Sequence, residues 1–94
     1  MDIFELTKIY GDRVKDDRTF FEPYAHGRLE YEELRQEILN HYTDTPSGKD
    51  GIIGEAIDVI ACMIDVIQRY DPNFTNEEFK KYYESKLIKW EKQI

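Results

Sequence analysis

Apolar residues recur at helical spacing along four segments of the chain. Residues 3–15 and 28–42 place apolar side chains three or four positions apart, as amphipathic helices do. Residues 52–70 are apolar on most sides of a third helix, which the residues "DPN" end. A fourth helix starts after Thr75, which can form a capping box with Glu78, and continues to the end of the chain. No alternating strand pattern competes, so the sequence predicts an all-α fold.

Turn-forming residues mark the connections between these helices. Residues 16–27 contain Pro23 and Gly27 and are predicted to form a connection. Residues 43–51, "TDTPSGKDG", are predicted to form a polar loop, because Pro46 and the two glycines break any helix there.

Composition limits the classes of protein that the chain can represent. With 94 residues it forms one small domain over residues 1–94. A domain of this size buries a limited part of its surface, so we expect a four-helix bundle that is completed by a homodimer or homotetramer. The net charge of −7 repels phosphate backbones and anionic bilayers, which argues against nucleic-acid or membrane partners. The single cysteine, Cys62, and the charged N-terminal segment favour a cytoplasmic location.

Carboxylates interrupt the most apolar segment, "GIIGEAIDVIACMIDVI". Glu55, Asp58 and Asp65 fall within one sector of the third helix, beside a face that is otherwise built for burial. A buried carboxylate must be protonated, paired with a base or bound to a metal. The segment offers no lysine or arginine before Arg69, so a cation is a candidate ligand.

The second helix carries a matching set of acids at spacings of three and four, namely Glu30, Glu33 and Glu37. If the second and third helices pack antiparallel, the two acidic rows meet and offer oxygen ligands to Mg²⁺ or Mn²⁺. Two plainer interpretations stay open. The acids of the second helix could form a solvated face. Glu55 could complement a helix dipole, although Asp58 could not.

The order "ExxE" (Glu30–Glu33), a gap of 21 residues and "GExxD" (Glu55–Asp58) resembles the MazG-like nucleotide pyrophosphohydrolases, which are all-α enzymes. The resemblance implies that Glu30, Glu33, Glu55 and Asp58 bind Mg²⁺, with Mn²⁺ as a substitute. Glu37 would be a further ligand, an acid beside the ligands or the catalytic base. In an alternative register, Glu33 and Glu37 replace Glu30 and Glu33 as the ligand pair of the second helix.

The resemblance also implies the reaction. A Mg²⁺-dependent enzyme of this kind cleaves the α–β bond of a nucleoside or deoxynucleoside triphosphate and controls nucleotide pools, with Glu33 or Glu37 as the proton acceptor. Lys86 and Lys89 on the fourth helix would contact phosphate, and Tyr42 could stack on the base. Two alternatives remain: a non-catalytic helical interaction module, and a module that binds nucleotides without cleaving them.

Overall fold

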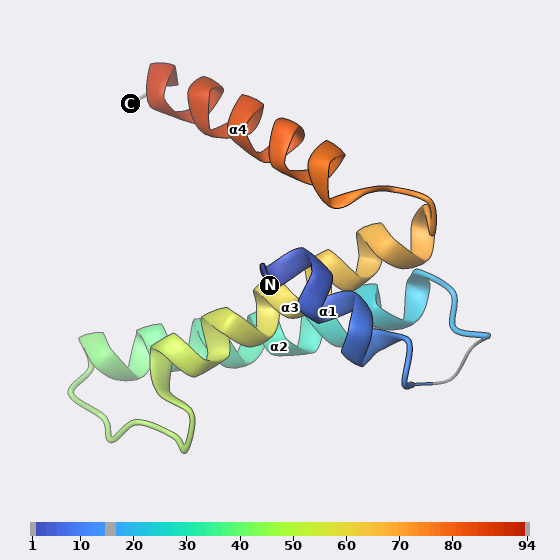
Figure 1. Ribbon diagram of the computed structural model, residues 1–94. Helices are drawn as coiled ribbons and strands as arrows, with labels where there is room; N and C mark the ends of the chain where they lie inside the picture. The colour runs from blue at the N-terminus through green and yellow to red at the C-terminus, as the bar shows by residue number, and fades with distance from the viewer. Residues whose placement is uncertain (1, 15–16, 94) are drawn as a thin grey trace.

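The computed structural model describes residues 2–14 and 17–93, and these form four helices (Figure 1): α1 (Ile3–Gly11), α2 (Phe21–Tyr42), α3 (Gly51–Tyr70) and α4 (Asn76–Gln93). The described residues contain no strand, so the all-α prediction is confirmed. No helix among these residues is long and apolar enough to cross a bilayer.

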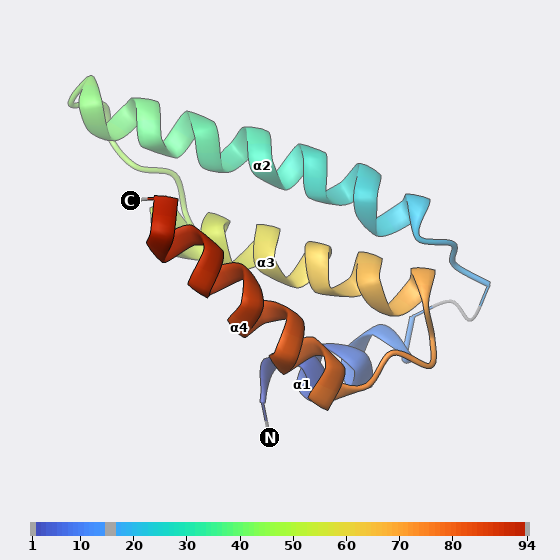
Figure 2. The ribbon, with the colours of Figure 1, turned by 90° about the horizontal axis from the view of Figure 1, so that it is seen from above.

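Helices α2 and α3 run antiparallel and side by side along most of their length (Figure 2). Gly27 lies where the two helices approach each other tightly. A β-carbon at Gly27 would sit 2.5 Å from Met63 Cε and 3.2 Å from Cys62 Cβ. The absence of a side chain at this position therefore lets α2 and α3 approach closely enough for polar groups of the two helices to meet.

The prediction that residues 16–27 form a connection is wrong from Phe21 onward, because α2 begins there and not at residue 28. Pro23 occupies the first turn of the helix, where a backbone N–H has no partner to lose. Gly27 is retained within the helix because α3 fills the space beside it.

The helix predicted over residues 3–15 ends at Gly11. Residues 12–14 leave the helix in a turn, and residue 15 lies outside the described residues. The last residue of the predicted fourth helix, residue 94, also lies outside them.

Helix α1 packs against both α3 and the start of α4. The backbone carbonyl of Phe4 accepts a hydrogen bond from Gln68 Nε2 at 2.7 Å, and the Phe4 ring stacks on Phe79 with 4.9 Å between centroids. The predicted capping box is present: Glu78 N donates to Thr75 Oγ1 at 3.1 Å, and Thr75 N donates to Glu78 Oε1 at 3.0 Å. The first turn of α4 is therefore fixed against α1.

Beyond its first turns α4 diverges from the rest of the molecule (Figure 1). Among the described residues it packs against α1 but against neither α2 nor α3, and none of its residues is buried. The Cα radius of gyration is 15.2 Å, whereas a compact domain of this length has roughly 12 Å. A single chain is therefore open, with α4 as an extended arm.

Candidate functional site

Three carboxylates converge across the seam between α2 and α3. Glu30 comes from α2, and Glu55 and Asp58 lie one turn apart on α3. One oxygen from each lies within 4.8 Å of the other two. Glu55 is only 7% exposed, and Glu30 and Asp58 are partly buried. We refer to Glu30, Glu55 and Asp58 as the carboxylate cluster.

The cluster disfavours its own negative charge. Burial, followed by a side-chain hydrogen bond with Glu33 and the charges of Glu33, Asp50 and Asp58, raises the pKa of Glu55 from an ordinary 4.5 to about 7. Burial also raises the pKa of Glu30, as do the charges of Glu33 and Asp58, while a hydrogen bond with His26 Nε2 at 2.9 Å opposes this rise. Glu33 therefore lies beside both Glu30 and Glu55, although its own side chain is exposed.

Among the described residues no lysine or arginine neutralises the cluster. Within residues 2–14 and 17–93 no lysine or arginine forms an ion pair with Glu30, Glu55 or Asp58. The buried Oε2 atoms of Glu30 and Glu55 have no hydrogen-bond partner among these residues. Converging carboxylate oxygens, two of which lack a donor among the described residues, fit a hard divalent cation such as Mg²⁺, which prefers oxygen ligands.

Asp65, the third acid of the apolar helix, has a different environment. Arg18 donates to its two oxygens at 2.6 and 3.2 Å, and Arg69 Nε lies 3.4 Å from Oδ1. The charge of Asp65 is thus neutralised by arginines. Of the acids on α3 that the sequence singled out, Glu55 and Asp58 remain without such a partner among the described residues. No sequence signal pointed to this pair, because Arg18 precedes Asp65 by 47 residues and lies in a connection.

Glu37 is buried but lies away from the cluster. It follows Glu30 by seven residues, which is about 10 Å along the helix axis. Its Oε1 accepts a hydrogen bond from Gly48 N at 2.7 Å, and a β-carbon at Gly48 would sit 2.5 Å from that oxygen. Glu37 therefore holds the loop between α2 and α3 against α2, while its Oε2 has no partner among the described residues.

The expected substrate-binding residues do not join the cluster within one chain. Tyr42 is exposed in the last turn of α2, about 18 Å along the axis from Glu30. Lys86 and Lys89 are exposed on the arm formed by α4, which packs against neither helix of the cluster within the described part of the chain. Of the residues expected from the sequence, the structure brings Glu30, Glu33, Glu55 and Asp58 together.

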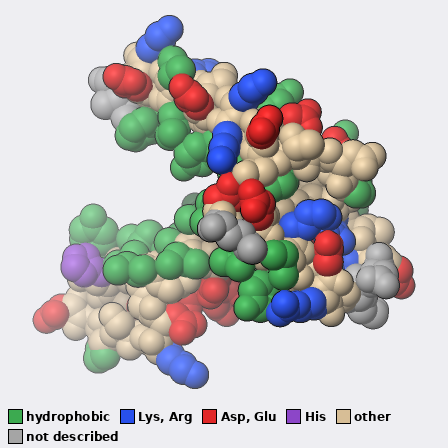
Figure 3. Space-filling view, viewed as in Figure 1, with side chains coloured by type: hydrophobic (Ala, Val, Ile, Leu, Met, Phe, Trp, Pro, Cys, Tyr) green, Lys and Arg blue, Asp and Glu red, His purple; other side chains and the backbone are tan. Residues whose placement is uncertain are grey.

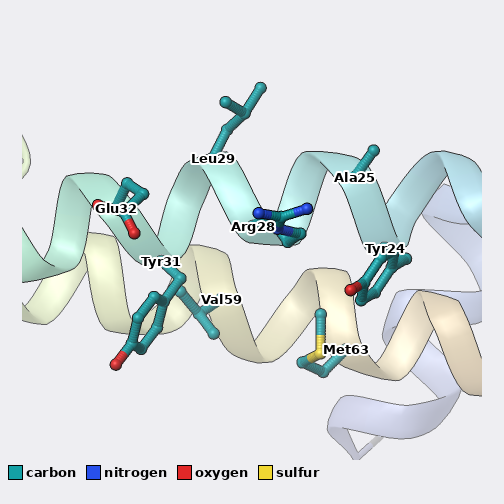
Figure 4. Close-up of a pocket in the computed structure, with 9 residues that line it drawn as sticks. Tyr24, Ala25, Arg28, Leu29, Tyr31, Glu32, Val59 and Met63 are labelled. Carbon is teal, nitrogen blue, oxygen red and sulfur yellow. The ribbon is translucent and has the colours of Figure 1, made fainter.

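An open pocket of about 510 Å³ also lies between α2 and α3 (Figure 4). Tyr31 and Tyr24 from α2 and Val59 and Met63 from α3 line it, while Leu29 at its rim points away from α3. No member of the carboxylate cluster lines this pocket. The seam therefore has a mainly apolar pocket that is separate from its acidic cluster.

No family model, curated protein or solved structure matches this chain.

Proposed function

We propose that the protein is a MazG-like, Mg²⁺-dependent nucleoside triphosphate pyrophosphohydrolase that acts on nucleotide pools. The observation that carries this proposal is the nearly buried carboxylate of Glu55, which faces Glu30 and Asp58 with one oxygen unpartnered. A buried carboxylate must be protonated, paired with a base or bound to a ligand, and a bound Mg²⁺ would compensate the charge of Glu55 together with those of Glu30 and Asp58. The order of the motifs, ExxE followed by GExxD, supports the same class of enzyme.

The role proposed for each side chain follows from its position. Glu30, Glu55 and Asp58 would hold Mg²⁺, for which Mn²⁺ could substitute, and the bound ion would supply charge neutralisation and polarisation of the phosphate. Glu33 is exposed beside Glu30 and Glu55, so its carboxylate accepts the proton of the attacking water. The water oxygen bonds to the α-phosphorus, the bond from that phosphorus to the α–β bridging oxygen breaks, and pyrophosphate leaves with the monophosphate as the other product.

The test is release of pyrophosphate from a panel of ribo- and deoxynucleoside triphosphates in Mg²⁺, Mn²⁺ or EDTA. We expect metal-dependent release that falls by about 100-fold or more in Glu55→Gln and Asp58→Asn, because each removes a charge from the site. Glu32→Gln is the matched control, since Glu32 is an exposed acid on α2 outside the cluster. Absence of release with every nucleotide, together with absence of a thermal shift in Mg²⁺, would refute the proposal.

One observation favours a second candidate, a helical module that binds a metal–nucleotide complex or a protein without catalysis. Helix α4, which carries Lys86 and Lys89, packs against neither α2 nor α3 within the described residues, so one chain brings no lysine of α4 to the cluster. This candidate predicts a metal-dependent thermal shift with nucleotide but no pyrophosphate, and the same panel separates it from the enzyme.

A further inference from the structure

An apolar stripe on α3 is covered over only half of its length. Ile53, Ile57, Ile60 and Ile64 recur at spacings of four, three and four, which places them on one helix face. Ile64 is 4% exposed, at the end of the stripe where α1 packs on α3. The other three are between 51% and 77% exposed. The N-terminal half of the stripe therefore lacks a covering element among the described residues.

Helix α4 repeats this arrangement. Its stripe starts at Phe79, which stacks on Phe4 of α1, and continues through Tyr83, Leu87 and Trp90. These last three side chains are between 46% and 60% exposed. Most helical stability in proteins comes from packing of the apolar face, so this exposed stripe leaves α4 without its main source of stability.

The arm formed by α4 and the pair formed by α2 and α3 enclose an open wedge, with α1 at its apex (Figure 1). Figure 3 shows hydrophobic side chains along the α2–α3 pair, in the lower part of the view, and along the side of α4 that faces this pair. A pocket of about 290 Å³, lined by Ile3, Tyr83 and Leu87 among others, lies where α4 leaves α1. The wedge is therefore apolar on both walls.

The exposed area is the amount that a stable homodimer needs. The chain exposes 7589 Å², roughly 1,900 Å² more than the 5,700 Å² expected for a compact monomer of its mass. A standard interface buries about 800 Å² per partner, and obligate homodimers bury more. The excess area matches an interface of the obligate class, which a second copy with the same wedge can supply.

Charge complementarity also indicates a second copy. Residues 80–93 carry five lysines against two glutamates, whereas the whole chain has a net charge of −7. The part of α4 beyond its first turn is thus basic and the rest of the chain strongly acidic, so residues 80–93 of one copy are attracted to the body of another.

We propose that two copies interlock, each laying the apolar face of its α4 on the exposed isoleucine stripe of the partner's α3. The contact is isologous, because each copy donates one arm and receives one. Burying both stripes in this way covers Ile53, Ile57 and Ile60 on one chain with Tyr83, Leu87 and Trp90 on the other. This proposal does not depend on the proposed enzymatic activity.

Cross-linking between distinguishable copies tests the contact. In a Cys62→Ser background, a large-tagged chain carries Ile57→Cys and a small-tagged chain carries Leu87→Cys, and the two are mixed, exchanged and oxidised. We expect a disulfide that joins the large and small chains. Leu29→Cys in place of Ile57→Cys is the control, because Leu29 is equally exposed but lies on α2 and points away from α3, and it should form little product (Figure 4).

The state of association gives a second measurement. Sedimentation equilibrium should show a dimer for the wild type, and Ile57→Glu or Leu87→Glu should weaken dimerisation at least 100-fold, while Leu29→Glu leaves it unchanged. Circular dichroism identifies variants that fail to fold. For such variants the cross-linking result decides whether α4 of one copy contacts α3 of the other. A monomeric wild type would overturn the proposal. So would a chain carrying both cysteines that links only within itself, since α4 would then close on its own α3.

Discussion

Arg18 and Asp65 form a bidentate ion pair across the fold, with Nη1 donating to Oδ2 at 2.6 Å and Nη2 donating to Oδ1 at 3.2 Å. The same Nη2 donates to the carbonyl of Gly11 at 3.0 Å. The pair thereby ties the segment after α1 to α3 and neutralises one of the acids on the apolar helix. Asp65 is therefore a partly buried acid whose charge is compensated by an arginine, unlike the acids of the carboxylate cluster.

Arg18→Gln should destabilise the protein by about 3 kcal/mol, because it leaves the carboxylate of Asp65 partly buried beside Arg69 alone. Urea unfolding at pH 7 measures the change. Arg35→Gln is the matched control: its 3.9 Å pair with Glu32 is exposed, so the change should stay within about 0.5 kcal/mol. Equal effects of the two substitutions would show that the Arg18–Asp65 pair contributes nothing beyond an exposed pair.

The raised pKa of Glu55 predicts how stability depends on pH. Between about 4.5 and about 7 the folded chain holds a proton on Glu55 that the unfolded chain has lost. The free energy of unfolding without metal should therefore fall as pH rises through this window and then level off. Unfolding of wild type and Glu55→Gln at a series of pH values, in EDTA, isolates the effect.

We expect the stability of wild type relative to Glu55→Gln to decrease from pH 4.5 to pH 7. Saturating Mg²⁺ should oppose the decrease, because the ion stabilises the ionised cluster. Glu32→Gln, which removes an exposed acid, should show no such trend relative to wild type. A difference between wild type and Glu55→Gln that is constant with pH would contradict the raised pKa.

Substitutions of Glu37 separate its structural contact from a catalytic role. Glu37→Ala removes the acceptor for Gly48 N and should cost about 2 kcal/mol of stability. In Glu37→Gln the amide oxygen can accept the same hydrogen bond, so we expect near wild-type stability and pyrophosphate release. Loss of release in a stably folded Glu37→Gln would instead make Glu37 the proton acceptor.

Local sequence signals predicted much of the fold. Helical spacing predicted four helices, and Thr75 with Glu78 predicted the start of α4, because both signals act within a few residues. The start of α2 was missed because Pro23 and Gly27 are helix breakers in isolation. A first turn tolerates the proline, and contact with α3 explains the glycine.

The candidate site, like the fold, was predictable only in part from the sequence. The acids at Glu55 and Asp58 stood out against an apolar helix, and the matching spacing on α2 pointed to Glu30, Glu33 and Glu37, of which Glu37 lies away from the cluster. The separation of Asp65 from them was not predictable, since it depends on a partner 47 residues away. The position of Lys86 and Lys89 on a divergent arm depends on tertiary packing, which helical periodicity does not contain.

The close approach at Gly27 provides a test of the packing that assembles the cluster. Gly27→Val should destabilise the protein by about 2 kcal/mol, because its side chain collides with Met63 Cε and Cys62 Cβ. Gly27→Ala should cost less, since better helix propensity recovers about 1 kcal/mol and the end of Met63 can move. Ala25→Val, on an exposed position of α2, controls for the propensity of valine and should cost about 0.5 kcal/mol.

A double-mutant cycle then identifies the contact itself. In a Met63→Ala background the cost of Gly27→Val should fall by about 1 kcal/mol, because the nearest colliding atom is gone while Cys62 Cβ remains. Additive effects would place the crowding elsewhere. Because Gly27 lies one turn before Glu30, a valine that forces α2 away from α3 should also widen the carboxylate cluster and weaken the thermal shift produced by Mg²⁺. Ala25→Val should leave that shift unchanged, which links the close packing of the helices to the geometry of the site.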